Sequence, residues 1–173
     1  MLDRPLVSLA GLVLAAIAAT ATAASAADPA PLGATQSAAL WATLNVCDTP
    51  DHPDTLGIRA SMPGDGSASD GMFVRFQVQY LQRDGTWKAL GPGGDSGFVA
   101  IGAAKAKVRE TGRLFVLAPP ARHTFELRGL VTFEWRDAAG AVLRRMRRAT
   151  TSGHRSAAGA DPQGYSAAVC VMG

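Results

Sequence analysis

The feature that most constrains this chain is a two-residue alternation of apolar side chains across residues 72–80. The apolar set consists of Met72, Val74, Phe76, Val78 and Tyr80, and it alternates with residues that are mostly polar. A repeat of two places successive side chains on opposite faces of an extended backbone. The sequence therefore predicts a strand with one face in a hydrophobic core and the other face toward solvent.

Two hairpins follow from the same pattern. Asp84-Gly85 lies just after the first strand, and this dipeptide favours a tight turn because glycine tolerates a positive φ. Residues 87–90 are predicted as the return strand, with Trp87 crossing the core. Later, an alternation over residues 131–136 precedes a turn at 137–140, and residues 141–151 are predicted to return antiparallel.

Shorter apolar runs separated by glycine and proline clusters complete the pattern. We predict strands at residues 40–46, 56–61, 98–101, 114–117, 124–127 and 166–172. Many short strands with such turns are typical of a sandwich or a barrel. The predicted fold class is all-β, an antiparallel sandwich of about 7–9 short strands.

The stretches FVRFQVQYLQRDGTWKAL and LRGLVTFEWRDAAGAVLRR, followed by a terminal strand that contains Cys170, resemble an immunoglobulin-like or fibronectin type III-like sandwich. The resemblance is one of architecture and implies a sandwich, but it implies no ligand. The chain departs from the immunoglobulin pattern in three places, one of which is that its two cysteines are too far apart in sequence. Trp87 lies forty residues after Cys47, and Tyr165 precedes Cys170 by five residues rather than two.

The N-terminus has the pattern of a secretory signal peptide. Arg4 precedes an apolar run, and Ala24-Ser25-Ala26 provides a small-residue cleavage site. We predict three segments: a signal peptide at residues 1–26, a flexible segment at 27–39 and a sandwich domain at 40–173. The product would be secreted, periplasmic or on the cell surface, with no membrane span after cleavage. The alternative is an uncleaved N-terminal anchor.

The chain has two cysteines, Cys47 and Cys170, one near each end of the predicted mature product. In an oxidising compartment an even pair most simply forms a disulfide. The alternatives are two free thiols or a metal site, although no CxxC spacing supports a metal. We predict a Cys47–Cys170 disulfide that encloses most of the domain.

The stretch from Gly93 to Phe98 reads GGDSGF and resembles the Gly-Asp-Ser-Gly around the nucleophile of trypsin-like proteases. In that family a histidine base and an aspartate are brought to the serine by two packed barrels. Here the only upstream histidine, His52, lies in Asp-His-Pro, and Phe98 replaces a further glycine. The residues before Ser96 are also too few for most of two barrels. We interpret GGDSGF as a turn between strands.

Other candidate chemistry is sparse. Acidic residues in the loops 48–54 and 64–71 lack the downstream bidentate glutamate of a calcium loop. The histidines are isolated from one another: His52, His123 and His154. No zinc signature, phosphate-binding glycine loop or dinucleotide fingerprint is present. The sequence predicts no metal site, no cofactor and no catalytic residues.

Charge is distributed unevenly along the chain. Residues 27–100 carry a net charge of −4, and residues 101–173 carry +7. Four arginines surround Met146: Arg144, Arg145, Arg147 and Arg148. Because successive strand residues point to opposite faces, we predict an edge strand with arginine on both sides. These four arginines are also the candidate contacts for a polyanion. Glu126 and Glu134, spaced evenly with Arg128 and Arg136, are interpreted as charge pairing on a solvent-exposed face.

These observations predict an exported, non-enzymatic binding or structural module of the cell envelope or exterior. One alternative is a polyanion-binding protein that uses the basic C-terminal half, and another is an envelope hydrolase with an unrecognised loop site. The partner would be a cell-surface protein or an anionic polymer. Nucleic acid is not expected, because the product is exported and lacks the interleaved aromatics of single-strand binders.

Overall fold

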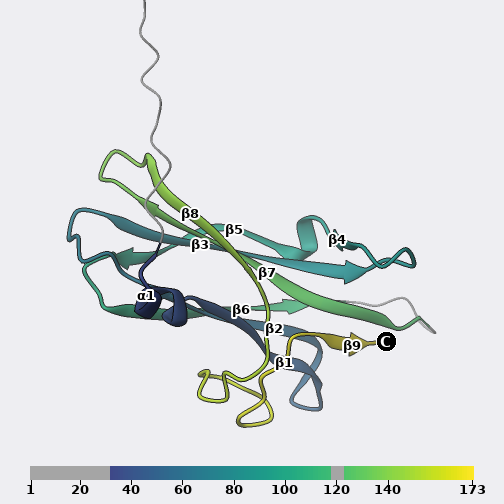
Figure 1. Cartoon of the computed structure of the whole chain (residues 1–173). Coiled ribbons are helices and arrows are strands. Elements are labelled where there is room, and N and C mark those ends of the chain that lie inside the picture. Colours follow the sequence, from purple (N-terminus) through teal and green to yellow (C-terminus); the bar gives the residue numbers. More distant parts are fainter. Residues whose placement is uncertain (1–31, 118–122) are drawn as a thin grey trace, which may run out of the picture.

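The computed structural model describes residues 32–117 and 123–173. Within these residues nine strands, paired antiparallel, form two sheets that pack face to face (Figure 1). The predicted all-β sandwich is confirmed. The predicted signal peptide at residues 1–26 lies outside the described residues. Residues 34–39, within the segment set apart from the domain by sequence, form the short helix α1 (Ala34–Ala39).

One sheet has three strands and the other has six. The three-stranded sheet has the order β1 (Trp41–Thr49), β2 (His52–Pro63) and β6 (Val108–Val116). The six-stranded sheet has the order β4 (Trp87–Ala89), β3 (Gly71–Leu81), β7 (Phe125–Arg136) and β8 (Val142–Ala149). In addition, β5 (Asp95–Ala103) pairs with β3, and β9 (Cys170–Met172) pairs with β7. A single 3₁₀ turn, η1 (Pro92–Gly94), links β4 to β5.

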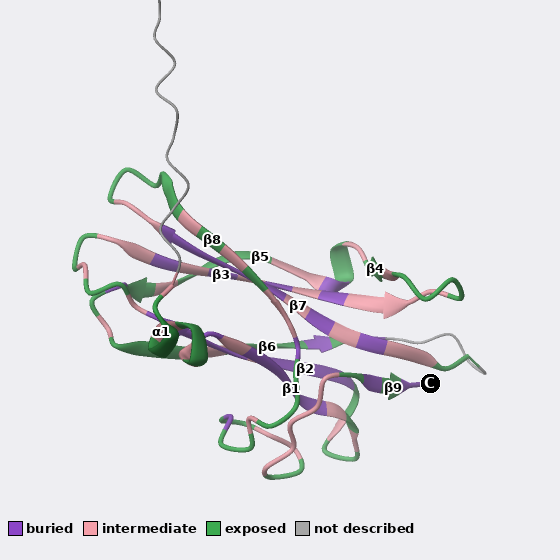
Figure 2. Ribbon diagram, in the orientation of Figure 1, coloured by how far each residue is buried: buried purple, intermediate pink, exposed green. Residues whose placement is uncertain are grey.

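The core lies between the two sheets, on the faces that the alternation predicts. In β3 the buried residues are Met72, Val74, Phe76 and Val78, each at most 2% exposed. In β7, Phe133 lies opposite Val74 and Trp135 opposite Met72. Figure 2 shows the resulting alternation of buried and intermediate bands along β3. Burying large apolar side chains contributes about 1.5–3 kcal/mol each, which explains why the two-residue repeat determines the sheet faces.

The sequence divides β7 incorrectly into two strands, at residues 124–127 and 131–136. The structure has one continuous strand through Gly129. A Cβ atom at Gly129 would lie 2.7 Å from Thr150 Cγ2 and 2.9 Å from Ile58 Cδ1. This glycine therefore permits close approach of the β2 side chain rather than ending the strand.

The prediction that Trp87 crosses the core is wrong. Trp87 pairs with Leu81 on the face of β3 opposite to Tyr80, and the indole is half-buried on the outside of the sheet. The return strand β4 is only three residues long, and its pairing register, not its composition, decides which face receives Trp87.

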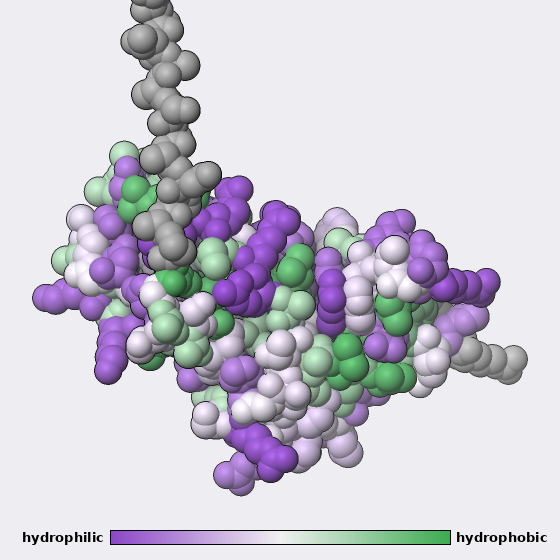
Figure 3. Space-filling view, viewed as in Figure 1, coloured by the Kyte–Doolittle hydropathy of each residue, from purple (hydrophilic) through white to green (hydrophobic). Residues whose placement is uncertain are grey.

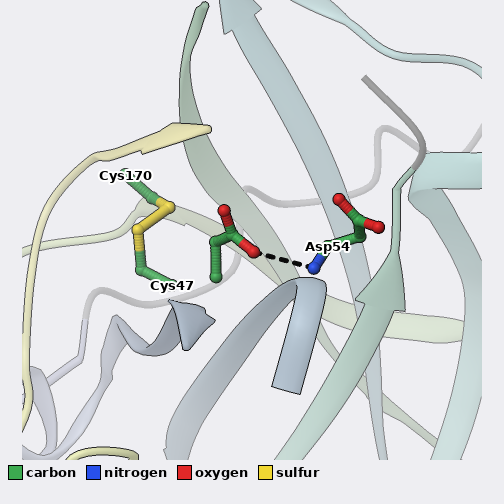
Figure 4. Close-up of a disulfide and its surroundings, with 4 residues drawn as sticks. Cys47, Asp54 and Cys170 are labelled. Carbon is green, nitrogen blue, oxygen red and sulfur yellow. Dashed lines mark hydrogen bonds between the residues drawn. A yellow bond between two sulfur atoms is a disulfide. The ribbon is translucent and has the colours of Figure 1, made fainter. Parts of the chain in front are cut away.

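The predicted disulfide is present and links the two sheets. Cys47 lies in β1 and Cys170 in β9, with their Cα atoms 5.7 Å apart (Figure 4). The same corner holds a hydrogen bond from the backbone N–H of Asp54 to Asp48 Oδ1, at 2.8 Å. Among the described residues, none of the helices has the length and apolar character needed to cross a membrane.

Candidate binding face on the six-stranded sheet

The outer face of the six-stranded sheet carries an array of arginine and aromatic side chains. They occupy the alternate positions of β3, β5, β7 and β8 that do not face the core, together with Trp87 of β4. We call this surface the arginine–aromatic face, and its members are Phe73, Arg75, Trp87, Phe98, Arg128, Arg136, Arg145 and Arg147.

Strand register arranges this face in rows across the sheet. One row contains Phe98, Arg75, Thr132 and Arg147, from β5, β3, β7 and β8 in turn. The next row contains Ala100, Phe73, Glu134 and Arg145. Because directly opposed residues point to the same side of a sheet, strands far apart in sequence supply side chains to one surface.

Glu134 binds two of the arginines on this face. Its side chain is fully buried, although it points away from the core. The Glu134 carboxylate accepts hydrogen bonds from Arg136 Nε at 2.8 Å and Arg145 Nε at 2.5 Å. The interpretation of Glu134 as part of a solvent-exposed face is therefore wrong, because the two arginines cover it. One carboxylate with two guanidinium groups leaves an excess positive charge above the sheet.

Aromatic rings lie against two of the guanidinium groups. The Arg136 guanidinium lies 4.2 Å from the Phe73 ring centroid and 4.8 Å from that of Phe98. A Cβ at Gly71 would lie 2.9 Å from the Phe73 ring, so this glycine leaves room for the ring. The Arg128 guanidinium lies 4.3 Å from the Trp87 ring centroid. Such cation–π contacts orient the arginines and leave N–H groups free at the guanidinium edges.

The interpretation of GGDSGF as a turn between strands is only partly right, because Gly93 and Gly94 end η1 whereas residues 95–98 begin β5 and border this face. Arg75 donates to both carboxylate oxygens of Asp95, and the backbone N–H of Gly97 donates to Asp95 Oδ1 at 2.9 Å. The Ser96 hydroxyl accepts from the Phe76 N–H at 2.9 Å and donates to the Gly97 carbonyl at 2.7 Å. Ser96 therefore participates in the irregular β3–β5 pairing, and Asp95 positions Arg75.

A pH dependence follows from this ion pair. The Arg75 hydrogen bonds, with smaller contributions from Gly97 and Gln77, lower the pKa of Asp95 from 3.8 to about 2. A depressed carboxyl pKa stabilises the fold above the unfolded value, and this contribution is lost as the pH falls through the folded value. Between pH 4 and pH 2 we expect wild type to lose about 1–2 kcal/mol more unfolding free energy than Asp95→Asn, allowing for solvent screening. Urea titrations at each pH would measure this, and parallel pH profiles would contradict it.

The arginine cluster of β8 is divided between two faces, as its spacing predicts for an edge strand. Arg145 and Arg147 point to the arginine–aromatic face, opposite Glu134 and Thr132. Arg144 and Arg148 point to the other side, opposite Trp135 and Val131, and the Arg144 guanidinium lies 5.6 Å from the Trp135 ring. Figure 3 shows hydrophilic side chains interspersed with hydrophobic ones along the upper edge of the molecule in this view.

No protein-family model and no curated protein matches this sequence. The site consists of guanidinium groups that contact aromatic rings and carboxylates on the outer face of one sheet. Among the described residues, the five arginines of this face share the outer side of the sheet with three carboxylates, those of Asp95, Glu126 and Glu134. The arrangement can hold oxyanions, because planar guanidinium groups match the geometry of carboxylate and sulfate.

The remaining candidate residues lie elsewhere. His52 Nδ1 is 2.9 Å from Asp161 Oδ2, and Thr49 donates to the same oxygen. His154 stacks on Trp41 with ring centroids 4.4 Å apart, and burial lowers the His154 pKa. His123 borders a recess of about 520 Å³ beside the β3–β4 turn. In residues 32–117 and 123–173, no three metal-ligating side chains converge.

The sequence singles out the β8 arginines and indicates that Arg128 and Arg136 are charge partners of nearby glutamates. It does not identify Arg75, Phe73, Phe98 or Trp87 as members of the same surface. The sequence contains part of this information. In residues 72–80, Phe73 and Arg75 occupy the alternate positions whose side chains do not enter the core. Joining that face to β5, β7 and β8 requires the strand order.

Proposed function

We propose that this chain is an exported binding module of the cell envelope or exterior, without catalytic activity, and that its ligand surface is the arginine–aromatic face. The disulfide is consistent with an oxidising compartment. The immunoglobulin-like sandwich belongs to this proposal as a scaffold that presents one sheet face. The observation that carries the proposal is that Arg136 lies over the rings of Phe73 and Phe98 and Arg128 lies over the ring of Trp87.

The ligand class that fits this face is an anionic polymer, such as a carboxylated or sulfated polysaccharide. Ordered arginines lose less conformational freedom on binding than free ones, which favours affinity. Repeated guanidinium groups spread over one sheet face match a repeated anionic ligand better than a small molecule, which usually occupies a concave pocket. The two β8 arginines on this face, Arg145 and Arg147, are the proposed contacts from the cluster found by sequence.

Binding to heparin and to polygalacturonate tests this function, with neutral dextran as the negative control. We expect wild type to bind both polyanions at low ionic strength and to release them as salt screens the charges. The test variant is Arg128→Gln/Arg147→Gln, which avoids the buried Glu134 cluster. The matched control is Arg113→Gln/Arg155→Gln, which removes the same charge from exposed positions away from this face.

We expect the Arg128→Gln/Arg147→Gln variant to lose on the order of tenfold in affinity, since exposed charge contacts contribute about 0.2–1 kcal/mol each. The control variant removes no contact with the ligand, so its affinity is expected to be within about twofold of the wild-type affinity. Isothermal titration calorimetry or biolayer interferometry would measure both. Equal weakening by the two variants would show that binding follows net charge alone and would reject the face.

A further inference from the structure

The lateral edges of the three-stranded sheet differ. At the β1 edge the C-terminal segment adds backbone bridges, Leu44 to Ala167 and Val46 to Asp161. At the other edge, β6 pairs with β2 along its whole length, and no described strand lies on its far side. A long open edge presents backbone N–H and C=O groups that are ready to pair with another strand.

Hydrogen bonds at the two ends of β6 show which residues face the open side. The Lys107 carbonyl accepts from Gly64 N–H at 3.2 Å, and Leu117 N–H donates to the Asp54 carbonyl at 2.7 Å. The β2–β6 register has no bulge, so odd-numbered residues direct their backbone groups toward β2. The even-numbered residues direct theirs to the open edge: Val108, Glu110, Gly112, Leu114 and Val116.

Three of these five residues carry exposed apolar side chains. Val108 is 45% exposed, Leu114 is 49% exposed and Val116 is 78% exposed. The two ends of β6 also match about Gly112, because each end has a valine four residues from it. If a second copy pairs antiparallel with Gly112 opposite Gly112, then Val108 lies opposite Val116 of the second copy at both ends, and Glu110 lies opposite Leu114. Each of these opposed pairs exchanges two backbone hydrogen bonds.

Charge complementarity also favours a pairing that is centred on Gly112. Arg59 lies opposite Gly112 in β2, and a Cβ at Gly112 would be 3.1 Å from Arg59 Cδ, so the arginine extends over the glycine. Among the described residues, Arg59 Nε is buried without a hydrogen-bond partner, 3.6 Å from the Glu110 carboxylate. In the paired arrangement Glu110 of the second copy lies diagonally across from Gly112, within about 7–8 Å between backbones. That distance brings its carboxylate to the Arg59 guanidinium.

We propose that the chain forms a symmetric homodimer through β6. The two strands pair antiparallel about Gly112, and the two three-stranded sheets join into one continuous sheet of six strands. The pairing is isologous, as a two-fold axis requires, because each copy offers the same edge to the other. The arginine–aromatic face belongs to the other sheet of each copy and stays open, so the dimer does not depend on the proposed function.

Sedimentation equilibrium of the disulfide-bonded chain over concentrations up to about 1 mM tests the dimer. Two surface variants test its register. Val108→Lys/Val116→Lys places like charges opposite each other at both ends, whereas Val108→Lys/Val116→Glu places opposite charges there. Like charges directly opposed destabilise strand pairing, and opposite charges support it. We expect wild type to dimerise. The Lys/Glu variant is expected to have a dimer dissociation constant within about threefold of the wild-type value, and the Lys/Lys variant is expected to have one at least tenfold higher.

Leu114→Pro provides an independent test, because it removes an N–H that points to the open edge and is not used by β2. We expect it to abolish the dimer while circular dichroism of the monomer is retained. A wild type that is monomeric at every concentration would overturn the proposal. Equal dimerisation of the Lys/Lys and Lys/Glu variants, or a Leu114→Pro variant that folds and still dimerises, would overturn it as well.

Discussion

Trp135→Ala is expected to lower the free energy of unfolding by about 3–5 kcal/mol, the largest effect of a single substitution that we predict. Trp135 is 1% exposed near the C-terminal end of β7 and packs against the three-stranded sheet. Its indole N–H donates to the Pro63 carbonyl at the end of β2, at 3.0 Å. The substitution therefore opens a cavity and also leaves a buried carbonyl unpaired. Urea denaturation followed by circular dichroism would measure the loss.

Two variants make this prediction specific. Trp135→Phe keeps most of the ring volume but removes the N–H, so its cost is expected to be about 1–3 kcal/mol. Trp87→Ala removes a tryptophan from the outer face, where the ring is only half-buried, and is expected to cost less than Trp135→Ala. If Trp87→Ala proved the more damaging change, the assignment of Trp135 to the core and Trp87 to the outer face would be wrong.

Removing the disulfide is expected to cost about 2–5 kcal/mol of unfolding free energy. Cys47 and Cys170 are 123 residues apart in sequence, so the bond restricts a long loop of the unfolded chain. It also connects β1 of one sheet to β9 of the other, and β9 has only three residues to hold it to β7. The double variant Cys47→Ala/Cys170→Ala avoids unpaired thiols, and its urea midpoint compared with wild type would give the loss.

Reduction provides the control for this variant. Wild type in excess reductant is expected to fall to the stability of Cys47→Ala/Cys170→Ala, and the double variant is expected to be insensitive to the reductant. We expect the C-terminal residues around β9 to lose amide-exchange protection first, because their pairing to β7 is short. A double variant as stable as oxidised wild type would show that the bond contributes nothing to the fold.

The arginine–aromatic face illustrates how far sequence reasoning reaches toward a site. Alternation in β8 alone separates Arg145 and Arg147 from Arg144 and Arg148, and the structure has this division. The same rule places Phe73 and Arg75 together. It does not place them beside Arg145, because that neighbourhood depends on β7 lying between β3 and β8. Glu134 shows the limit most clearly, since a carboxylate on an outward face is buried only because Arg136 and Arg145 converge on it.

Local patterns determined the class of fold, most of the strands, the core residues of β3 and β7, the turn at Asp84-Gly85 and the pairing of the only two cysteines. Each depends on side-chain periodicity, on backbone preference or on a count of thiols, and all three are properties of neighbouring residues or of the composition. Tertiary structure alone decided strand order, the continuity of β7 through Gly129, the outward position of Trp87 and the open edge at β6. These features depend on which distant strands meet and in what register, and the free energy of such contacts is not contained in any one segment.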